Sequence, residues 1–147
     1  MEKRYDAIIV GGGPAGLSAA IYMARARFHV LVIEKEKMGG QITITSEVVN
    51  YPGIFNTDGE ALTREMVRQA EAFGAEFLSA NVIGLSLAGD TKVVHTDRGD
   101  FEAMGLIYAA GAHPRLAGFT GEMEFRGHGV AYCATCDGAS FTGKDIF

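Results

Sequence analysis

The chain has 147 residues, 48% of them hydrophobic, and a net charge of −5. The length suits one domain with a buried core, and the hydrophobic content excludes a disordered chain. The acidic balance argues against nucleic acid or an anionic membrane as the main partner, because both attract a basic face. Glycine is enriched, with 20 residues against a usual share of about 7%, and its clustering indicates tight turns around a ligand.

The first predicted element is a β-strand over residues 5–10, an apolar run ending in glycines that is typical of a buried parallel strand. A helix should follow, with Pro14 in its first turn and Leu17, Ala20, Ile21 and Ala24 on one apolar face. Glycines interrupt the uncharged stretch between Asp6 and Arg25, so we exclude a signal peptide or a membrane span and expect a cytoplasmic protein.

The turn between strand and helix reads Gly11-x-Gly13-x-x-Gly16. Such a turn lets a pyrophosphate approach the backbone, where the free N–H groups of the helix start face its oxygens. A second apolar strand over residues 30–33 ends in Glu34, whose carboxylate can accept hydrogen bonds from ribose hydroxyls. Strand, glycine turn, helix, strand and acid in this order predict a dinucleotide site.

The middle of the chain predicts architecture rather than chemistry. Thr57 and Glu60 fit a capping box. The helix they begin has the apolar stripe Leu62, Met66, Ala70 and Phe73, and Gly74 can terminate it. Residues 81–104 read as an antiparallel β-meander, in which His95 is an exposed strand residue rather than a ligand, and residues 106–109 as a further buried strand.

Both cysteines lie in one short segment, Cys133-Ala134-Thr135-Cys136-Asp137. A disulfide spanning so little chain stabilises a fold weakly, whereas adjacent sulfurs can exchange two electrons through a mixed disulfide. Structural zinc normally needs four protein ligands, which this pair does not provide. A cysteine–histidine hydrolase would leave the second cysteine and the glycine turn unexplained. The segment therefore predicts a redox-active dithiol, with Asp137 as a proton donor or acceptor.

Taken together, these motifs resemble the N-terminal part of the low-molecular-weight thioredoxin reductases. The resemblance runs from Tyr5 to the last residue. It rests on the glycine turn at residues 11–16, Glu34, Gly39-Gly40-Gln41, Asn50-Tyr51-Pro52-Gly53, the turn at residues 109–112 and the segment from Cys133 to Gly138. It implies an α/β Rossmann-like FAD-binding fold, with a parallel sheet and a β-meander, truncated before the NADPH domain.

The resemblance also implies which residues hold FAD. They are Gly11, Gly13, Pro14, Ala15, Gly16, Glu34, Gly39, Gly40, Gln41, Asn50, Val82 and Gly111. The glycine turn would hold the pyrophosphate, Glu34 the adenosine ribose and Val82 the adenine. Ala110 stands where the family usually has threonine, so we leave it out of the predicted site. No metal site is expected.

In the implied mechanism, reduced flavin passes electrons to the Cys133–Cys136 disulfide, and Cys133 then attacks the disulfide of thioredoxin or a similar protein. We expect residues 1–114 to form part of the FAD domain and residues 115–147 the start of a redox-active NADPH domain. The chain would then be a fragment of a homodimeric enzyme, lacking a closing strand and unable to use NADPH alone. The alternatives are a ferredoxin-linked or peroxiredoxin-linked reductase and a non-catalytic nucleotide-binding module.

Overall fold

The computed structural model describes residues 4–126, 128–134 and 138–146. Its elements in chain order are β1 (Arg4–Val10), α1 (Pro14–Arg25), β2 (Val30–Glu34), the 3-10 helix η1 (Gly40–Ile44), α2 (Gly59–Ala72), β3 (Glu76–Ser79), β4 (Val82–Ser86), β5 (Lys92–Thr96), β6 (Gly99–Tyr108) and the 3-10 helix η2 (Gly138–Phe141). The chain divides into two compact units, Met1–Gly111 and Ala112–Phe147, which we describe separately.

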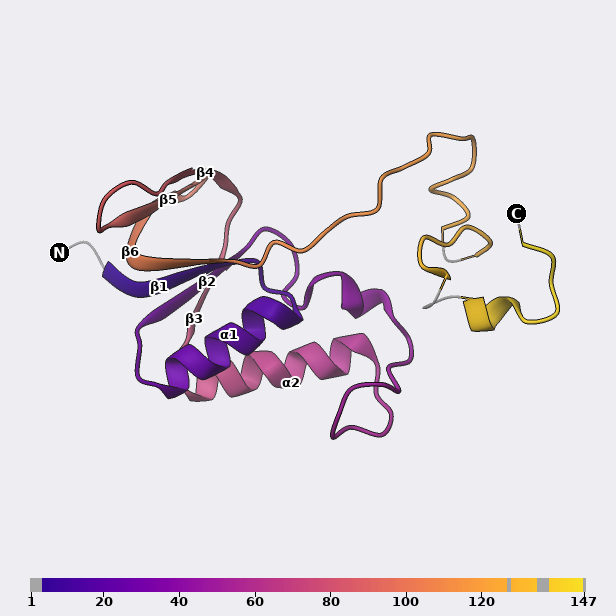
Figure 1. Ribbon diagram of the computed structural model, residues 1–147, viewed down its shortest axis with the longest axis horizontal. Helices are drawn as coiled ribbons and strands as arrows, with labels where there is room; N and C mark the ends of the chain where they lie inside the picture. The colour runs from indigo at the N-terminus through magenta and orange to yellow at the C-terminus, as the bar shows by residue number, and fades with distance from the viewer. Residues whose placement is uncertain (1–3, 127, 135–137, 147) are drawn as a thin grey trace. The chain divides into compact units, whose positions relative to one another are not determined.

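The first unit is built on one six-stranded sheet with the order β3-β2-β1-β6-β5-β4. The pairs β1–β2, β1–β6 and β2–β3 are parallel, whereas β4–β5 and β5–β6 are antiparallel. Helices α1 and α2 lie side by side along the parallel strands (Figure 1). The predicted α/β fold with a parallel sheet and an antiparallel meander is confirmed.

Alternating strand residues divide the core between the two faces of the sheet. Ile9, Val30 and Val32 pack with α1 and α2 residues such as Ala20 and Ala70. The neighbouring residues in the same strands point to the opposite face, where they pack against Val94 and Ala103 of the meander; they are Ile8, Val10, Leu31 and Ile33. This two-residue period on strands buried on both faces explains why β1 and β2 read as continuous apolar runs.

Three details differ from the expectations. Residues 106–109 are not a separate strand, because β6 runs unbroken over Gly99–Tyr108 and pairs with β5 at its start and with β1 along most of its length. Strand β3 was not anticipated; it extends the sheet beside β2. Phe73 is not part of the buried stripe but 45% exposed at the end of α2, where Gly74 adopts φ +95°.

The capping box predicted at Thr57 is wrong, because Asp58 caps α2. Its carboxylate accepts a hydrogen bond of 2.7 Å from the Ala61 N–H. Asp58→Ala should therefore lower the free energy of unfolding by about 1 kcal/mol, the usual loss for an N-cap, in urea denaturation of the purified chain. Thr57→Ala is the matched control, since the Thr57 hydroxyl only donates to the Asp58 carbonyl. Equal losses in the two variants would refute the assignment.

Tyr5 and Glu76, near the amino ends of the parallel strands, make the stability of the fold depend on pH in the alkaline range. Burial of Tyr5, with its hydrogen bond to Glu76, raises the pKa of the phenol to about 12. The protonated phenol thus stabilises the fold fully below about pH 10, and this contribution is lost as the pH rises through about 12. We expect unfolding experiments to show that loss across this window. Tyr5→Phe should flatten the dependence, and an unchanged profile in that variant would contradict this cause.

Candidate functional site

Two glycines of the turn after β1 are required by the fold itself. Gly11 has a φ of +108°, and a Cβ at this position would lie 2.2 Å from the carbonyl oxygen of Ala109, which directly follows β6. A Cβ at Gly16 would lie 1.9 Å from the Gly11 carbonyl oxygen. The turn is therefore tight, and α1 packs directly on the end of β1.

Gly13 is different, because nothing in the protein requires glycine there. As the N-cap of α1 it has a φ of −78° and a ψ of −177°, which any residue can adopt. An added Cβ would come no closer than 3.9 Å to Gly39 and Gly40. Pro14 is the first helical residue, and the first N–H groups of a helix, here from Ala15 and Gly16, have no intrahelical partner. The protein therefore leaves room for an added Cβ at Gly13, at the start of a helix, where an anion is favoured.

The Gly39–Gly40 segment lies beside this turn. The Gly39 N–H donates a hydrogen bond of 2.8 Å to the Gly12 carbonyl oxygen. A Cβ at Gly40 would be 3.0 Å from the Gly13 Cα. The Thr43 hydroxyl closes the first turn of η1 by donating to the Gly40 carbonyl at 2.8 Å. The structure thus brings together the two glycine segments that the sequence analysis assigned to one site.

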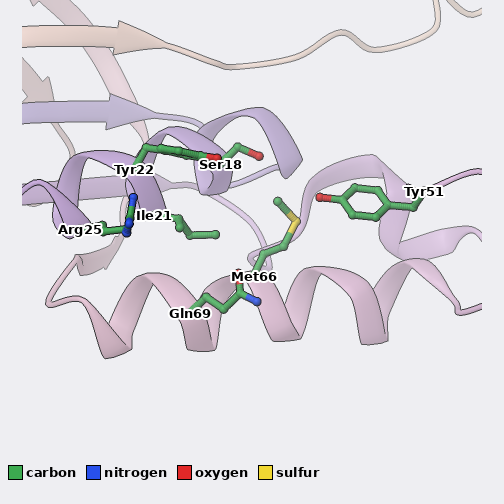
Figure 2. A pocket seen from close by; sticks show the side chains of 7 residues that line it. All are labelled: Ser18, Ile21, Tyr22, Arg25, Tyr51, Met66 and Gln69. Carbon is green, nitrogen blue, oxygen red and sulfur yellow. The ribbon is translucent and has the colours of Figure 1, made fainter. Parts of the chain in front are cut away.

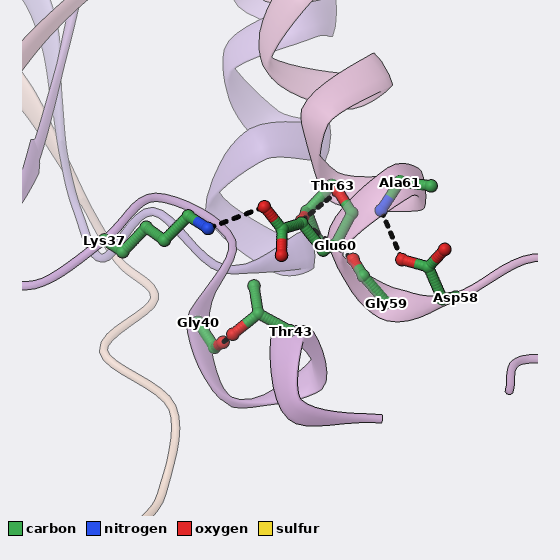
Figure 3. Close-up of polar contacts among 8 residues, drawn as sticks. All are labelled: Lys37, Gly40, Thr43, Asp58, Gly59, Glu60, Ala61 and Thr63. Atoms are coloured by element: carbon green, nitrogen blue, oxygen red, sulfur yellow. Dashed lines mark hydrogen bonds and ion pairs between the residues drawn. The ribbon is translucent and has the colours of Figure 1, made fainter. Parts of the chain in front are cut away.

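The start of α2 holds this second segment in place (Figure 3). Lys37 forms an ion pair of 2.7 Å with Glu60 on the first turn of α2, and this pair lowers the pKa of the Glu60 carboxyl. A Cβ at Gly59 would lie 1.8 Å from the Ile42 carbonyl oxygen, so η1 packs directly on the start of α2. The Thr63 hydroxyl is satisfied within the helix by the Gly59 carbonyl at 2.8 Å.

Glu34 is oriented by backbone groups at the end of β2. One carboxylate oxygen accepts from the Gly12 N–H at 2.8 Å, and the other accepts from the Glu36 N–H at 3.1 Å. A carboxylate has about four lone-pair sites, so capacity for further donors remains after these two bonds. The side chain is thereby positioned beside the glycine turn and can still accept hydrogen bonds from two hydroxyl groups.

A cavity of about 260 Å³ opens where the parallel strands end. Gly11, Glu34 and Val82 from the predicted site line it. The cavity is also lined by four residues that no motif predicted, Lys35, Ala80, Asn81 and Tyr108, and by Ala110, which is not part of the predicted site. Adjacency to Glu34 and Val82 was the only available signal for Lys35 and Asn81. Carboxyl ends of parallel strands, where β1 is flanked by β2 and β6, are the usual ligand position in such sheets.

The predicted residues Gly13, Pro14, Ala15, Gly16, Gly39 and Gly40 belong to the two glycine segments and do not line this cavity. Three further predicted residues lie outside both the glycine segments and the cavity. Gln41 is exposed in η1, Asn50 is exposed in the loop between η1 and α2, and Gly111 is exposed with a φ of +67° at the end of the first unit. None of them lines the cavity. Their assignment to the flavin stays a prediction.

The second unit carries the predicted dithiol. Cys133 is half-buried and disulfide-bonded. Cys136 and Asp137, the other two predicted catalytic residues, lie outside the described residues. The oxidised state of Cys133 is what a redox-active pair requires in one half of its cycle.

A larger cavity, of about 350 Å³, is lined by residues of both α1 and α2 (Figure 2). Ile21 and Met66 face it from the two helices, and the Tyr51 ring closes one end. Arg25 and Gln69 add polar groups. The mixed lining and the distance along α1 from the glycine turn mark it as separate from the cavity at the strand ends.

The meander holds a Ser–His–Asp network across three strands. Ser86 Oγ lies 2.9 Å from His95 Nε2, and His95 Nδ1 lies 2.9 Å from Asp100 Oδ1. The side chains of His95 and Asp100 are 35% and 61% exposed, and neither cavity is lined by these residues. We therefore interpret the network as a link between β4, β5 and β6. His95 lies in a strand, as expected.

Within residues 4–126, 128–134 and 138–146, no three His, Cys, Asp or Glu side chains are grouped as metal ligands. No helix in the same described ranges is long and apolar enough to cross a bilayer.

Comparison with known proteins identifies one family. Residues 5–145 match the family model described as pyridine nucleotide-disulphide oxidoreductase. The chain is 47% identical to the thioredoxin reductase of Peptoclostridium acidaminophilum over 148 residues, which is 100% of the chain and 47% of that relative. The chain spans about half the length of the curated relatives it matches.

Solved structures of thioredoxin reductases superpose on this chain. The thioredoxin reductase of Streptococcus pyogenes superposes with a TM-score of 0.87 at 40% identity, covering 96% of this chain and 46% of that one. A ferredoxin-flavin thioredoxin reductase from Clostridium acetobutylicum superposes with a TM-score of 0.71 at 30% identity, covering 96% of this chain and 49% of that one.

Proposed function

This chain belongs to the pyridine nucleotide-disulphide oxidoreductase family, and on that premise we propose that it carries the FAD-binding edge and the redox-active dithiol of a thioredoxin reductase. Gly13 carries the proposal. Its backbone conformation and surroundings would accept a side chain, so a ligand's approach explains the glycine better than the fold does. The donors of α1 and the carboxylate of Glu34 suit the pyrophosphate and ribose of such a ligand.

FAD, when bound, supplies a carrier that accepts a hydride from a nicotinamide and passes electrons to a disulfide. The chain's own residues bind and orient it. The N–H groups of Ala15 and Gly16 would face the pyrophosphate, and Glu34 would accept from the ribose hydroxyls. The cavity at the strand ends, with Val82 and Asn81 on its wall, would receive the adenosine.

The dithiol would act by exchange. In the reduced pair, the Cys133 thiolate attacks the disulfide of thioredoxin and forms a mixed disulfide; the Cys136 thiolate then displaces the second thioredoxin thiolate. Asp137 is proposed to supply the proton that the leaving sulfur takes up. Two electrons leave the pair, and thioredoxin gains two thiols.

We propose NADPH as the electron donor and a homodimer as the assembly of the full-length enzyme. Thioredoxin as the partner rests on the names of the relatives. Because the pair must be reduced again in every cycle, a reducing compartment such as the cytoplasm suits it. Ferredoxin is the second candidate donor, favoured by the similarity to the ferredoxin-flavin enzyme.

Two measurements on the purified chain test the proposal. FAD should bind at one equivalent, seen as a flavin absorption spectrum that stays with the protein during gel filtration. The chemically reduced chain should convert one equivalent of oxidised thioredoxin to its dithiol form. A Cys133→Ser variant should bind FAD and fail in the second assay. A chain that does not bind flavin would refute the proposed FAD site. A reduced chain that leaves thioredoxin oxidised would refute the proposed dithiol function.

A further inference from the structure

A buried carboxylate organises the second unit just before the dithiol. Glu122 is only 3% exposed. One of its oxygens accepts from the Ala117 N–H at 2.8 Å, and the other accepts from the Gly118 N–H at 2.6 Å. The Ala117 N–H, together with further donors, holds the pKa of Glu122 below its ordinary value although burial opposes this. The side chain therefore acts as an ionised acceptor that gathers the loop at residues 117–118.

The third partner of Glu122 is the residue that precedes Cys133. The Tyr132 hydroxyl donates a hydrogen bond of 2.7 Å to Glu122 Oε1. The guanidinium carbon of Arg126 lies 5.4 Å from the centroid of the Tyr132 ring, within the range of a cation–π contact. Tyr132 is thus held at its hydroxyl and at its ring face. Hydrogen bonds to charged groups are among the stronger ones, so Glu122 is the principal anchor.

These contacts occur in the state in which Cys133 is disulfide-bonded. Fixing Tyr132 restricts the backbone next to the Cys133 sulfur, and a restricted sulfur closes a ring more readily than a mobile one. We propose that Glu122, acting through Tyr132, is a positioning residue that favours the disulfide form of the Cys133–Cys136 pair. This inference rests on the proposed dithiol function. It means that residues outside the cysteine pair help to set the equilibrium between its disulfide and dithiol forms.

The test is the equilibrium of the chain with glutathione. Two glutathione thiols reduce the protein disulfide to the dithiol and become one glutathione disulfide, so thiol trapping and mass spectrometry give the equilibrium constant. Tyr132→Phe removes only the hydroxyl. We expect the equilibrium to shift about fivefold toward the dithiol, the factor for the net contribution of one hydrogen bond that is made in the disulfide form and lost in the dithiol form. Glu122→Gln should shift it in the same direction.

Tyr22→Phe is the matched control, because Tyr22 is a tyrosine of the first unit that is 72% exposed. It should leave the equilibrium unchanged. A Tyr132→Phe chain with the constant of the parent would overturn the inference, even if Glu122→Gln fails to fold. Flavin binding and thioredoxin reduction are measured separately, so the loss of either would count against the proposed function and not against this anchor.

Discussion

Gly13→Ala should weaken FAD binding about 5- to 150-fold while leaving the unliganded fold as stable as the parent. The new Cβ meets only contacts of 3.9 Å in the protein, at a φ of −78° that alanine adopts freely. With FAD bound it would occupy the space through which the pyrophosphate reaches the start of α1. An overpacked contact costs about 1–3 kcal/mol, which accounts for the range in affinity. Flavin fluorescence titration and urea denaturation measure the two quantities.

Gly16→Ala is the matched variant, with the same side chain added three residues later. Its Cβ would lie 1.9 Å from the Gly11 carbonyl oxygen, and neither backbone segment can yield without moving β1 or α1. We expect this variant to lose about 3 kcal/mol or more of folding stability, and FAD should not restore it fully. A Gly13→Ala chain that binds FAD as tightly as the parent would show that the close approach is not used.

The contrast between these glycines shows how far sequence could predict the site. The spacing of Gly11, Gly13 and Gly16 predicted a tight turn and a ligand, because both follow from local backbone geometry. It could not show that the protein itself requires Gly11 and Gly16 but not Gly13. Gly16 meets the Gly11 carbonyl within the turn itself, but the requirement at Gly11 and the free space at Gly13 depend on Ala109 and Gly39, which approach from distant parts of the chain.

Contacts between distant parts of the chain also explain why parts of the fold were not predicted. Strands β1 and β2 were predicted with nearly their observed bounds, since each is a strong apolar run. Strand β3 has four half-buried or exposed residues and becomes a strand through pairing with β2, which no local signal encodes. The cavity wall at Asn81 and Tyr108 likewise depends on which strands are neighbours. Glu34 could be predicted because the acid follows directly on its strand.

Replacing Glu34 should have the second large effect on FAD binding. Glu34→Ala removes the acceptor proposed for the ribose and also leaves the buried Gly12 N–H without its 2.8 Å partner. A hydrogen bond to a charged group contributes about 1.5–3 kcal/mol, so we expect affinity to fall about 10- to 150-fold. Glu34→Gln keeps one acceptor oxygen, so its affinity for FAD should fall less. Glu36→Gln is the control, because its exposed side chain only pairs with Lys35 at 3.5 Å.

The Glu34 carboxylate should also make the site select FAD over NADP⁺. This selectivity would distinguish a ribose contact from a merely structural role of Glu34. Hydroxyl groups can donate to Glu34, whereas a 2′-phosphate on the adenosine ribose would place negative charge against it. NADP⁺ should therefore fail to displace FAD from the parent chain even in large excess. Glu34→Gln relieves the repulsion, so NADP⁺ should compete better in that variant than in Glu36→Gln. Equal competition in the parent and both variants would mean that Glu34 serves only to hold Gly12 and the end of β2.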